Sequence, residues 1–218
     1  MLYEEELKKI QDKILKIGEA IIVSNGLLLE ALQDCDTQKF HDAKTNLNNM
    51  GSKTSKIDND IIKILALYSP EARDLRQVVS YLKITNELVR ASANTRSFIK
   101  GFTDVCNDVD LQIINEYAIP MQKSTTKALT YAINMLNIDC ADELQDIYND
   151  VLIEESKTDD LYEMVEKNLF IQAAKSDEFE KFHKMLKALR KSEKIADRAT
   201  SIANLLLYIK VGGNFHQV

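Results

Sequence analysis

The chain has 218 residues, of which 45% are apolar, 28% charged and 7% aromatic. Glycine and proline number only 6 and 2, whereas average usage is about 7% and about 5%. So few turn-forming residues argue against sandwiches, barrels and glycine-loop nucleotide folds, which all need frequent turns. The formal net charge of −6 disfavours a broad nucleic-acid footprint, so we expect no nucleic-acid partner.

The first residues, the hydropathy and the cysteines together favour a cytoplasmic protein. Met1–Tyr3 leads directly into three glutamates, whereas a secretory signal has a basic start and an apolar continuation. No apolar run approaches the ~18–20 residues of a membrane span. Cys35, Cys106 and Cys140 are widely spaced and form no C-x-x-C unit. Neither a disulfide framework nor a thiolate metal site is therefore expected.

Apolar residues at helical spacing predict three long helices in the first half of the chain. The first covers about 30 residues, and its apolar seam consists of Leu7, Ile10, Ile14, Ile17, Ile21 and Leu28. Residues 34–37 are typical of a turn, and a second helix is predicted from there to about Tyr68. Pro70 suits the first turn of the third helix, with Ser69 as its N-cap. We expect that helix to end near residues 102–104.

The second half of the chain repeats this pattern. A fourth helix is predicted over about 108–137, kinked or restarted at Pro120. A fifth follows over about 142–174 and a sixth over about 177–210. Gly212–Gly213 suits a left-handed turn at the end of the sixth helix. The sequence therefore predicts an entirely helical protein.

A constant shift of 104 positions relates the two halves. It aligns the helix boundaries without a gap, and it pairs Leu7 with Leu111, Ile10 with Ile114, Leu32 with Leu136, Leu65 with Leu169, Leu82 with Leu186 and Lys83 with Lys187. We therefore predict an internal duplication, in which residues 1–104 and 105–218 each form a three-helix bundle and the two bundles lie side by side.

Four carboxylates interrupt or follow the apolar pattern of the last two helices. Glu155 and Glu193 stand where the heptad-like series predicts a core side chain, and Asp159 and Asp197 follow four residues later. Residues four apart share a helix face, with about 5–6 Å between their Cβ atoms. Half-buried acid pairs on adjacent helices repel one another unless a cation lies between them. Carboxylate clusters in helical bundles often hold iron, manganese, magnesium or calcium.

A second interpretation of these acids is a solvated helix face. The fifth helix is acidic throughout, and Lys157, Lys194 or Arg198 can pair with the carboxylates as surface salt bridges. The shift of 104 positions favours a single site, because the counterparts in the first half all lack a carboxylate: Gly51, Ser55, Val89 and Ala93. We expect no equivalent metal cluster in the first repeat.

Three motifs resemble the PhoU family of phosphate-signalling regulators. Residues 69–76 are similar to the family's P-x-A-x-D-L-R element at the start of a third helix. Residues 193–203 are similar to its E-R-I-G-D-H-A-x-N-I-A element, and residues 155–162 to the D-x-x-x-D-x-L-Y of the partner helix. The duplicated three-helix architecture matches along nearly the whole chain.

The resemblance implies a cytoplasmic regulator, usually a homodimer, without enzymatic activity. In that family it acts with a phosphate-specific ABC transporter and a sensor histidine kinase, as a negative regulator of phosphate-starvation signalling. The resemblance also implies metal binding through E/D-x-x-x-D motifs, which match Glu155, Asp159, Glu193 and Asp197 here. The metal, whether iron, zinc or magnesium, is left open, because hard oxygen ligands suit several ions.

Three arginines on the third helix form a predicted partner surface, and two other functions stay open. Arg73, Arg76 and Arg90 suit an acidic or phosphorylated partner, since arginine forks bind carboxylate and phosphate well. The alternatives are a carboxylate-ligated metalloenzyme of helical-bundle type and a metal-free helical adaptor. The three histidines are isolated, so a ferritin-like di-iron site lacks its histidine ligands.

Overall fold

The computed structural model describes residues 2–103, 106, 111–173 and 179–212, apart from the side chains of residues 172 and 173. Among these residues there is no strand, and the first half contains α1 (Leu2–Asp34), α2 (Thr37–Asn46), α3 (Met50–Tyr68) and α4 (Ala72–Thr103). The second half contains α5 (Leu111–Ile113), a π-helical turn (Ile114–Ala118), α6 (Ile119–Asn134), a 3-10 turn (Met135–Asn137), α7 (Ala141–Ala173) and α8 (Phe179–Val211). The prediction of an all-α fold is confirmed.

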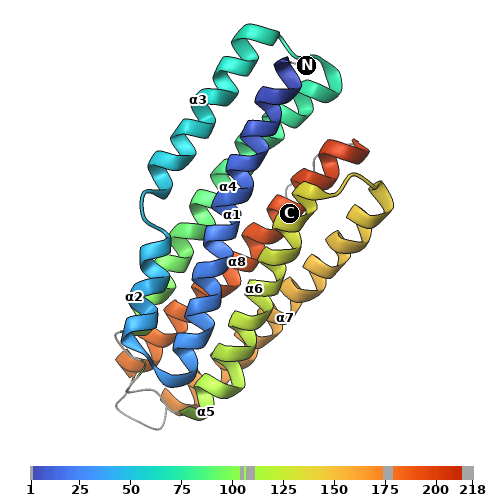
Figure 1. Ribbon diagram of the computed structural model, residues 1–218. Coiled ribbons are helices and arrows are strands. Elements are labelled where there is room, and N and C mark those ends of the chain that lie inside the picture. Colours follow the sequence, from blue (N-terminus) through green and yellow to red (C-terminus); the bar gives the residue numbers. More distant parts are fainter. Residues whose placement is uncertain (1, 104–105, 107–110, 174–178, 213–218) are drawn as a thin grey trace.

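Two groups of three long helices lie side by side with their axes roughly aligned (Figure 1). One group consists of α1, α3 and α4, with α2 continuing the line of α3, and the other consists of α6, α7 and α8. Contacts between the groups run mainly along α4 and α8 and along α1 and α6. Both hydrophobic core clusters contain residues from both halves. The tandem bundles therefore share their core, while the predicted boundary after residue 104 falls outside the described residues and stays a prediction.

A fully buried polar network joins the two halves at the centre of the molecule. The Asn25 side chain of α1 donates to Thr95 Oγ1 of α4 at 3.1 Å, and it accepts from the Gln122 amide of α6 at 2.8 Å. Ser192 of α8 donates to Gln122 Oε1 at 2.9 Å and is 3.0 Å from Thr125 Oγ1. Because buried polar groups are costly when unpaired, this network fixes the relative positions of four helices.

The predicted second helix is divided into α2 and α3, so its continuity over residues 37–68 was wrong. Asn49 adopts φ 61° at the break, a conformation that asparagine tolerates better than most residues. Leu47, which caps α2, is buried, and the Arg96 guanidinium of α4 donates to its carbonyl oxygen. A charged side chain from another helix thus satisfies a carbonyl that the break leaves without a helical partner.

The predicted start of the third helix was also wrong by two residues. Ser69 is the left-handed C-cap of α3, with φ 44°, and α4 begins at Ala72. Pro70 lies in the short connection, where its missing N–H removes no helical hydrogen bond. Pro120 lies at the start of α6 after the π-helical turn, as predicted. Gly212 follows α8 in a left-handed conformation, with φ 78°, which confirms that part of the prediction, while Gly213 lies outside the described residues.

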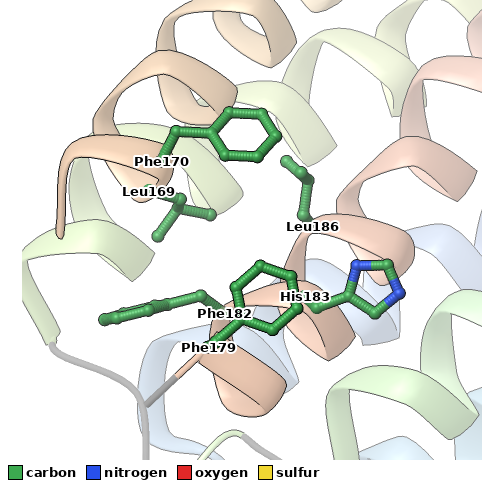
Figure 2. Close-up of a pocket in the computed structure, with 6 residues that line it drawn as sticks. All are labelled: Leu169, Phe170, Phe179, Phe182, His183 and Leu186. Atoms are coloured by element: carbon green, nitrogen blue, oxygen red, sulfur yellow. The ribbon is translucent and has the colours of Figure 1, made fainter. Parts of the chain in front are cut away.

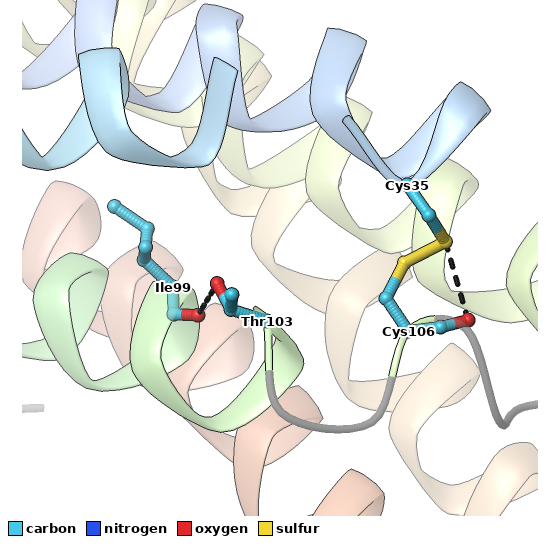
Figure 3. The surroundings of a disulfide bond; sticks show 4 residues. All are labelled: Cys35, Ile99, Thr103 and Cys106. Carbon is cyan, nitrogen blue, oxygen red and sulfur yellow. Dashed lines mark hydrogen bonds between the residues drawn. A yellow bond between two sulfur atoms is a disulfide. The ribbon is translucent and has the colours of Figure 1, made fainter. Parts of the chain in front are cut away.

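The structure contains a disulfide, so the expectation drawn from the cysteine spacing was wrong. Cys35, just after α1, is bonded to Cys106, just after α4, with 5.7 Å between the two Cα atoms (Figure 3). Nearby, the Thr103 hydroxyl donates to the Ile99 carbonyl oxygen at 2.7 Å in the last turn of α4. Spacing in the sequence could not reveal this pair, because it depends on the fold: the chain returns along α2 and α3, so α1 and α4 run in the same direction and the residues after their C-terminal ends, 71 positions apart, meet. Cys140 is free and exposed.

Candidate metal centre

The four predicted carboxylates lie on α7 and α8, which pack against each other. Carboxylate oxygens of Glu155, Asp159 and Asp197 all lie within 4.8 Å of one another. Glu155 and Asp197 are half-buried, and Asp159 is exposed. The structure therefore brings three of the four carboxylates into one donor group that joins the two helices at the edge of their interface.

The position of this group follows from the local packing of α7. Every seventh residue from Leu144 to Val165 is buried, so this face of the helix is directed inward. These residues are Leu144, Val151, Thr158 and Val165. Glu155 and Asp159 flank Thr158 on the side of that face nearest α8, which places both carboxylates opposite Asp197. Helical spacing and the closeness of the neighbouring helix together create the cluster.

Glu193 lies beside this group in a different setting. It is 5% exposed, so the prediction of a glutamate at a core position of α8 is confirmed. Its Oε2 lies 3.1 Å from Arg190 Nε, without a well-aligned hydrogen bond from any described residue. Its Oε1 lies 3.3 Å from Lys194 Nζ. Glu193 is thus held chiefly by cations of its own helix.

Burial and mutual repulsion raise the pKa values of the clustered acids. Burial, followed by the charges of Asp159, Asp197 and Glu193, raises the pKa of Glu155 to about 7. Burial and the charge of Asp197 raise the pKa of Asp159, and the same two causes raise the pKa of Glu193. Partial burial and the closeness of like charges therefore both disfavour the ionised forms of these acids.

The positive charge of Lys194 offsets part of the negative charge of this cluster. Its ammonium donates to Asp197 Oδ2 at 2.7 Å. Although burial lowers the pKa of Lys194, the hydrogen bond with Asp197 and the nearby negative charges raise it overall. The salt-bridge interpretation of the sequence is therefore correct for Asp197 and Glu193. Asp159 makes no ion pair within the part of the chain that the structure describes, and neither does Glu155.

The acidic composition of α7 does not make all of its acids solvated. Glu154 is only 6% exposed, and it faces α6. Lys157 Nζ lies 2.8 Å and Lys127 Nζ 3.7 Å from its Oε1. Although burial raises the pKa of Glu154, hydrogen bonds from Lys157 and Ser124 lower it overall. Glu154 is thus a paired structural acid, unlike its neighbour Glu155.

The three arginines of the predicted partner surface have different surroundings along α4. Arg73 is exposed, and Arg90 is exposed with Glu87 at 3.6 Å. The Arg76 guanidinium lies over the Tyr208 ring of α8, 5.5 Å from its centroid, and against the backbone of Gly212. Arg76 therefore helps to pack α4 against α8, and a partner-binding role for the three arginines stays a prediction.

A separate apolar hollow lies near the last turn of α7 and the first turns of α8 (Figure 2). Leu169 and Phe170 reach it from α7, and Leu186 and the ring of Phe182 from α8. The exposed His183 imidazole is stacked on the Phe179 ring, with 5.9 Å between the ring centroids. Because its lining is almost wholly apolar, this hollow offers no metal ligand set.

The fold and the cluster define a class of protein: duplicated three-helix bundles with acids on the last two helices. Residues 14–98 and 118–206 match the PhoU domain model. The chain therefore belongs to the PhoU family, and the resemblance found in its motifs is confirmed. Among the described residues, no helix combines the length and the apolar content needed to cross a membrane.

Solved structures share this fold. The "Crystal structure of PhoU from Pseudomonas aeruginosa" has a TM-score of 0.85 at 20% identity, over 97% of this chain and 100% of that one. The phosphate transport system regulatory protein PhoU from Streptococcus pneumoniae has a TM-score of 0.84 at 18% identity, over 99% and 100% of the two chains. A search among curated proteins found no match.

Proposed function

We propose that this protein is a cytoplasmic, metal-binding regulatory adaptor of phosphate transport and phosphate-starvation signalling. Membership in the PhoU family supports the regulatory class, and one solved relative is named a phosphate transport system regulatory protein. The observation that carries the metal proposal is the convergence of Glu155, Asp159 and Asp197 within 4.8 Å. The adaptor binds other proteins and needs no catalytic group of its own.

The donor group fits a hard divalent cation. Its ligands are carboxylate oxygens from two helices, which is the chemistry that magnesium, iron or zinc can accept in bundles. The raised pKa values of Glu155 and Asp159 mean that an ion would relieve repulsion already present in the fold. Glu155, Asp159 and Asp197 would hold the ion, and Glu193 would complete the site after a change in its pairing with Lys194. A bound cation would thereby tie α7 to α8.

The metal proposal is tested by metal-dependent stability. In thermal unfolding with added magnesium, manganese, iron(II) or zinc, we expect at least one ion to stabilise the protein, by about 2.7 kcal/mol at 100 times its dissociation constant. Asp159→Asn and Asp197→Asn should abolish this gain with little change in shape. The matched control is Asp146→Asn, an exposed acid of the same helix. Equal stabilisation of all four proteins, or of none, would contradict the proposed site.

Docking is proposed at the end of the bundle where α4 begins and α8 ends. A hollow there is lined by the exposed side chains of Leu75 and Val79 together with Arg76. Arg73 is exposed one residue from this lining. Apolar groups bordered by arginine suit a partner segment that carries both apolar and acidic residues. We propose that a phosphate-specific ABC transporter or a sensor histidine kinase presents this segment, and that the adaptor acts as a homodimer.

Affinity capture from phosphate-replete and phosphate-starved cells tests the docking proposal. The wild-type chain should recover phosphate transporter subunits or the kinase from replete cells. Leu75→Asp combined with Arg73→Glu should lose them. The control, Ile62→Asp, changes an apolar side chain that is 59% exposed and lies on α3, a helix that contributes no residue to the lining of the hollow. Recovery of the same partners by both variants would refute this docking face, and sedimentation equilibrium would test the homodimer.

A further inference from the structure

A second charged surface, opposite in sign to the carboxylate cluster, lies between α4 and α8. The two helices border a groove of about 280 Å³. Lys184, Lys187 and Lys191 line it from α8, and Lys100 lines it from α4. No carboxylate is among the residues that line this groove. Four ammonium groups therefore border one small open space in a protein whose net charge is −6.

The charge of this groove is poorly compensated. Lys184 pairs with the exposed Glu180 at 2.8 Å. Lys100, Lys187 and Lys191 make no ion pair with any residue that the structure describes. Elsewhere along the same pair of helices, Glu87 of α4 and Arg198 of α8 neutralise each other at 2.9 Å. Cations that face one another repel, so an anion in this groove would be stabilised by several of them together.

The groove is elongated, and the residues at its base are small. Lys184, Lys187 and Lys191 recur on one face of α8, and a helix rises 1.5 Å per residue, so the row extends over about 10 Å. Gly101 and Ala188 form the floor, where a Cβ at Gly101 would lie only 3.1 Å from the Ala188 Cβ. Larger residues there would fill the space between the lysines. A row of this length can contact several anionic groups arranged in a chain.

We propose that this groove binds a condensed phosphate, a linear anion of at least three phosphoryl groups. Lysine ammonium groups bind phosphate oxygens as point charges and tolerate variable geometry, which suits a chain of equivalent phosphoryl groups. Lys187 and Lys191 contact successive phosphoryl groups of the anion along α8, and Lys100 contacts the anion from the α4 side of the groove. A compact polycarboxylate shares part of this chemistry, but its charges are fewer and less evenly spaced. The site is independent of the metal centre.

The test is isothermal titration of the full chain with tripolyphosphate, orthophosphate and citrate at low and at physiological ionic strength. We expect saturable binding of tripolyphosphate that weakens with salt, and much weaker binding of the other two anions. Lys100→Gln/Lys187→Gln/Lys191→Gln should weaken tripolyphosphate binding by about tenfold or more, because charge-assisted hydrogen bonds are lost. The matched control, Lys16→Gln/Lys53→Gln/Lys56→Gln, removes the same charge from exposed lysines elsewhere and should retain the affinity.

Equal weakening in both triple variants would overturn the proposal, because it would show attraction to net charge alone. Citrate binding as tight as tripolyphosphate binding would reassign the groove to polycarboxylates, and an absence of saturable binding would refute the site. Circular dichroism checks that both variants remain helical. Asp159→Asn should bind tripolyphosphate like the wild-type chain. This variant separates the groove from the metal centre, whose failure would leave the groove proposal intact.

Discussion

The two repeats differ in the contacts between their second and third helices, which are α2/α3 with α4 in the first repeat and α7 with α8 in the second. Under the shift of 104 positions, α7 corresponds to residues 37–69, which the first repeat divides into α2 and α3. In the second repeat, carboxylates of the unbroken α7 converge with Asp197 of α8. In the first repeat, Arg96 of α4 donates to the Leu47 carbonyl oxygen at the break. Leu47 and Arg96 correspond to Val151 and Thr200, which lie about one helical turn from Glu155 and Asp197. The first repeat therefore places a hydrogen bond between two helices close to the level at which the second repeat accumulates negative charge.

This difference explains which half should respond to ions. Gly51, Ser55 and Ala93, the first-repeat counterparts of three of the acids, are exposed and carry no charge. Val89, the fourth counterpart, is 36% exposed. These positions carry no carboxylate that would attract a cation, and the absence of a metal cluster in the first repeat stays a prediction. In the second repeat, burial and the neighbouring carboxylates raise the pKa of Glu155 to about 7, so protonation of this cluster should stabilise the fold.

The largest expected effect concerns the disulfide between Cys35, which follows α1, and Cys106, which follows α4. Cys35→Ser should lower the free energy of unfolding by up to about 4 kcal/mol, because the bond closes a long loop in the unfolded chain. Chemical denaturation without reductant measures the change. Adding reductant should bring the wild-type chain to the level of the variant, and this reduced state is expected in a cytoplasm.

Cys140→Ser, at the exposed free cysteine, is the matched control and should leave stability unchanged. If Cys35→Ser unfolds at the same denaturant concentration as the wild-type chain under oxidising conditions, the bond does not form in solution. The comparison between the repeats would then rest on Arg96 alone.

A smaller effect is expected at the break between α2 and α3. Arg96→Ala leaves the carbonyl of the buried Leu47 without its charged donor, so we expect a loss of about 1–3 kcal/mol. Arg90→Ala, with a side chain 65% exposed and a weak pairing to Glu87, should cost less than about 0.5 kcal/mol. Chemical denaturation of the two variants, with and without added metal, measures both losses. A metal-dependent loss in Arg96→Ala would contradict the division of roles between the repeats.

The sequence predicts the fold more reliably than the details at which the repeats differ. Helical periodicity and the constant shift identify the duplicated bundles because both record which faces are buried. The break at Leu47 depends on Arg96, 49 positions away, and local propensity contains no record of that contact. The Cys35–Cys106 bond likewise results from the packing of long helices.

Part of the candidate site was also predictable. Glu193 interrupts an apolar series and is buried as the pattern requires. On α7 the pattern was ambiguous, because a helix of 3.6 residues per turn drifts by about 20° per heptad. Glu154 consequently took a buried position facing α6, while Glu155 lies half-buried toward α8. The pairing of Lys194 with Asp197 was foreseen only as an alternative, since spacing alone does not rank a lysine above a metal ion.

The smallest expected effect is a pH dependence confined to the second repeat. Glu155 has a pKa of about 7 in the folded protein, above its ordinary value of 4.5, so folding favours the protonated form. Without metal, the stabilising contribution of Glu155 is complete below about pH 4.5 and is lost as the pH rises to about 7. Glu155→Gln should flatten this slope, whereas Glu143→Gln, at an exposed acid of the same helix, should leave it unchanged.

Metal binding should show the opposite dependence, because the ion competes with the proton on Glu155. Affinity is expected to increase as the pH rises toward about 7 and then to level off. Calorimetric titrations in buffers of different ionisation enthalpy measure the protons released, and the release should diminish above that pH. A proton release that is the same in Glu155→Gln as in the wild-type chain would place the titrating group elsewhere. That result would contradict the expectation that the pH dependence arises from Glu155 in the second repeat.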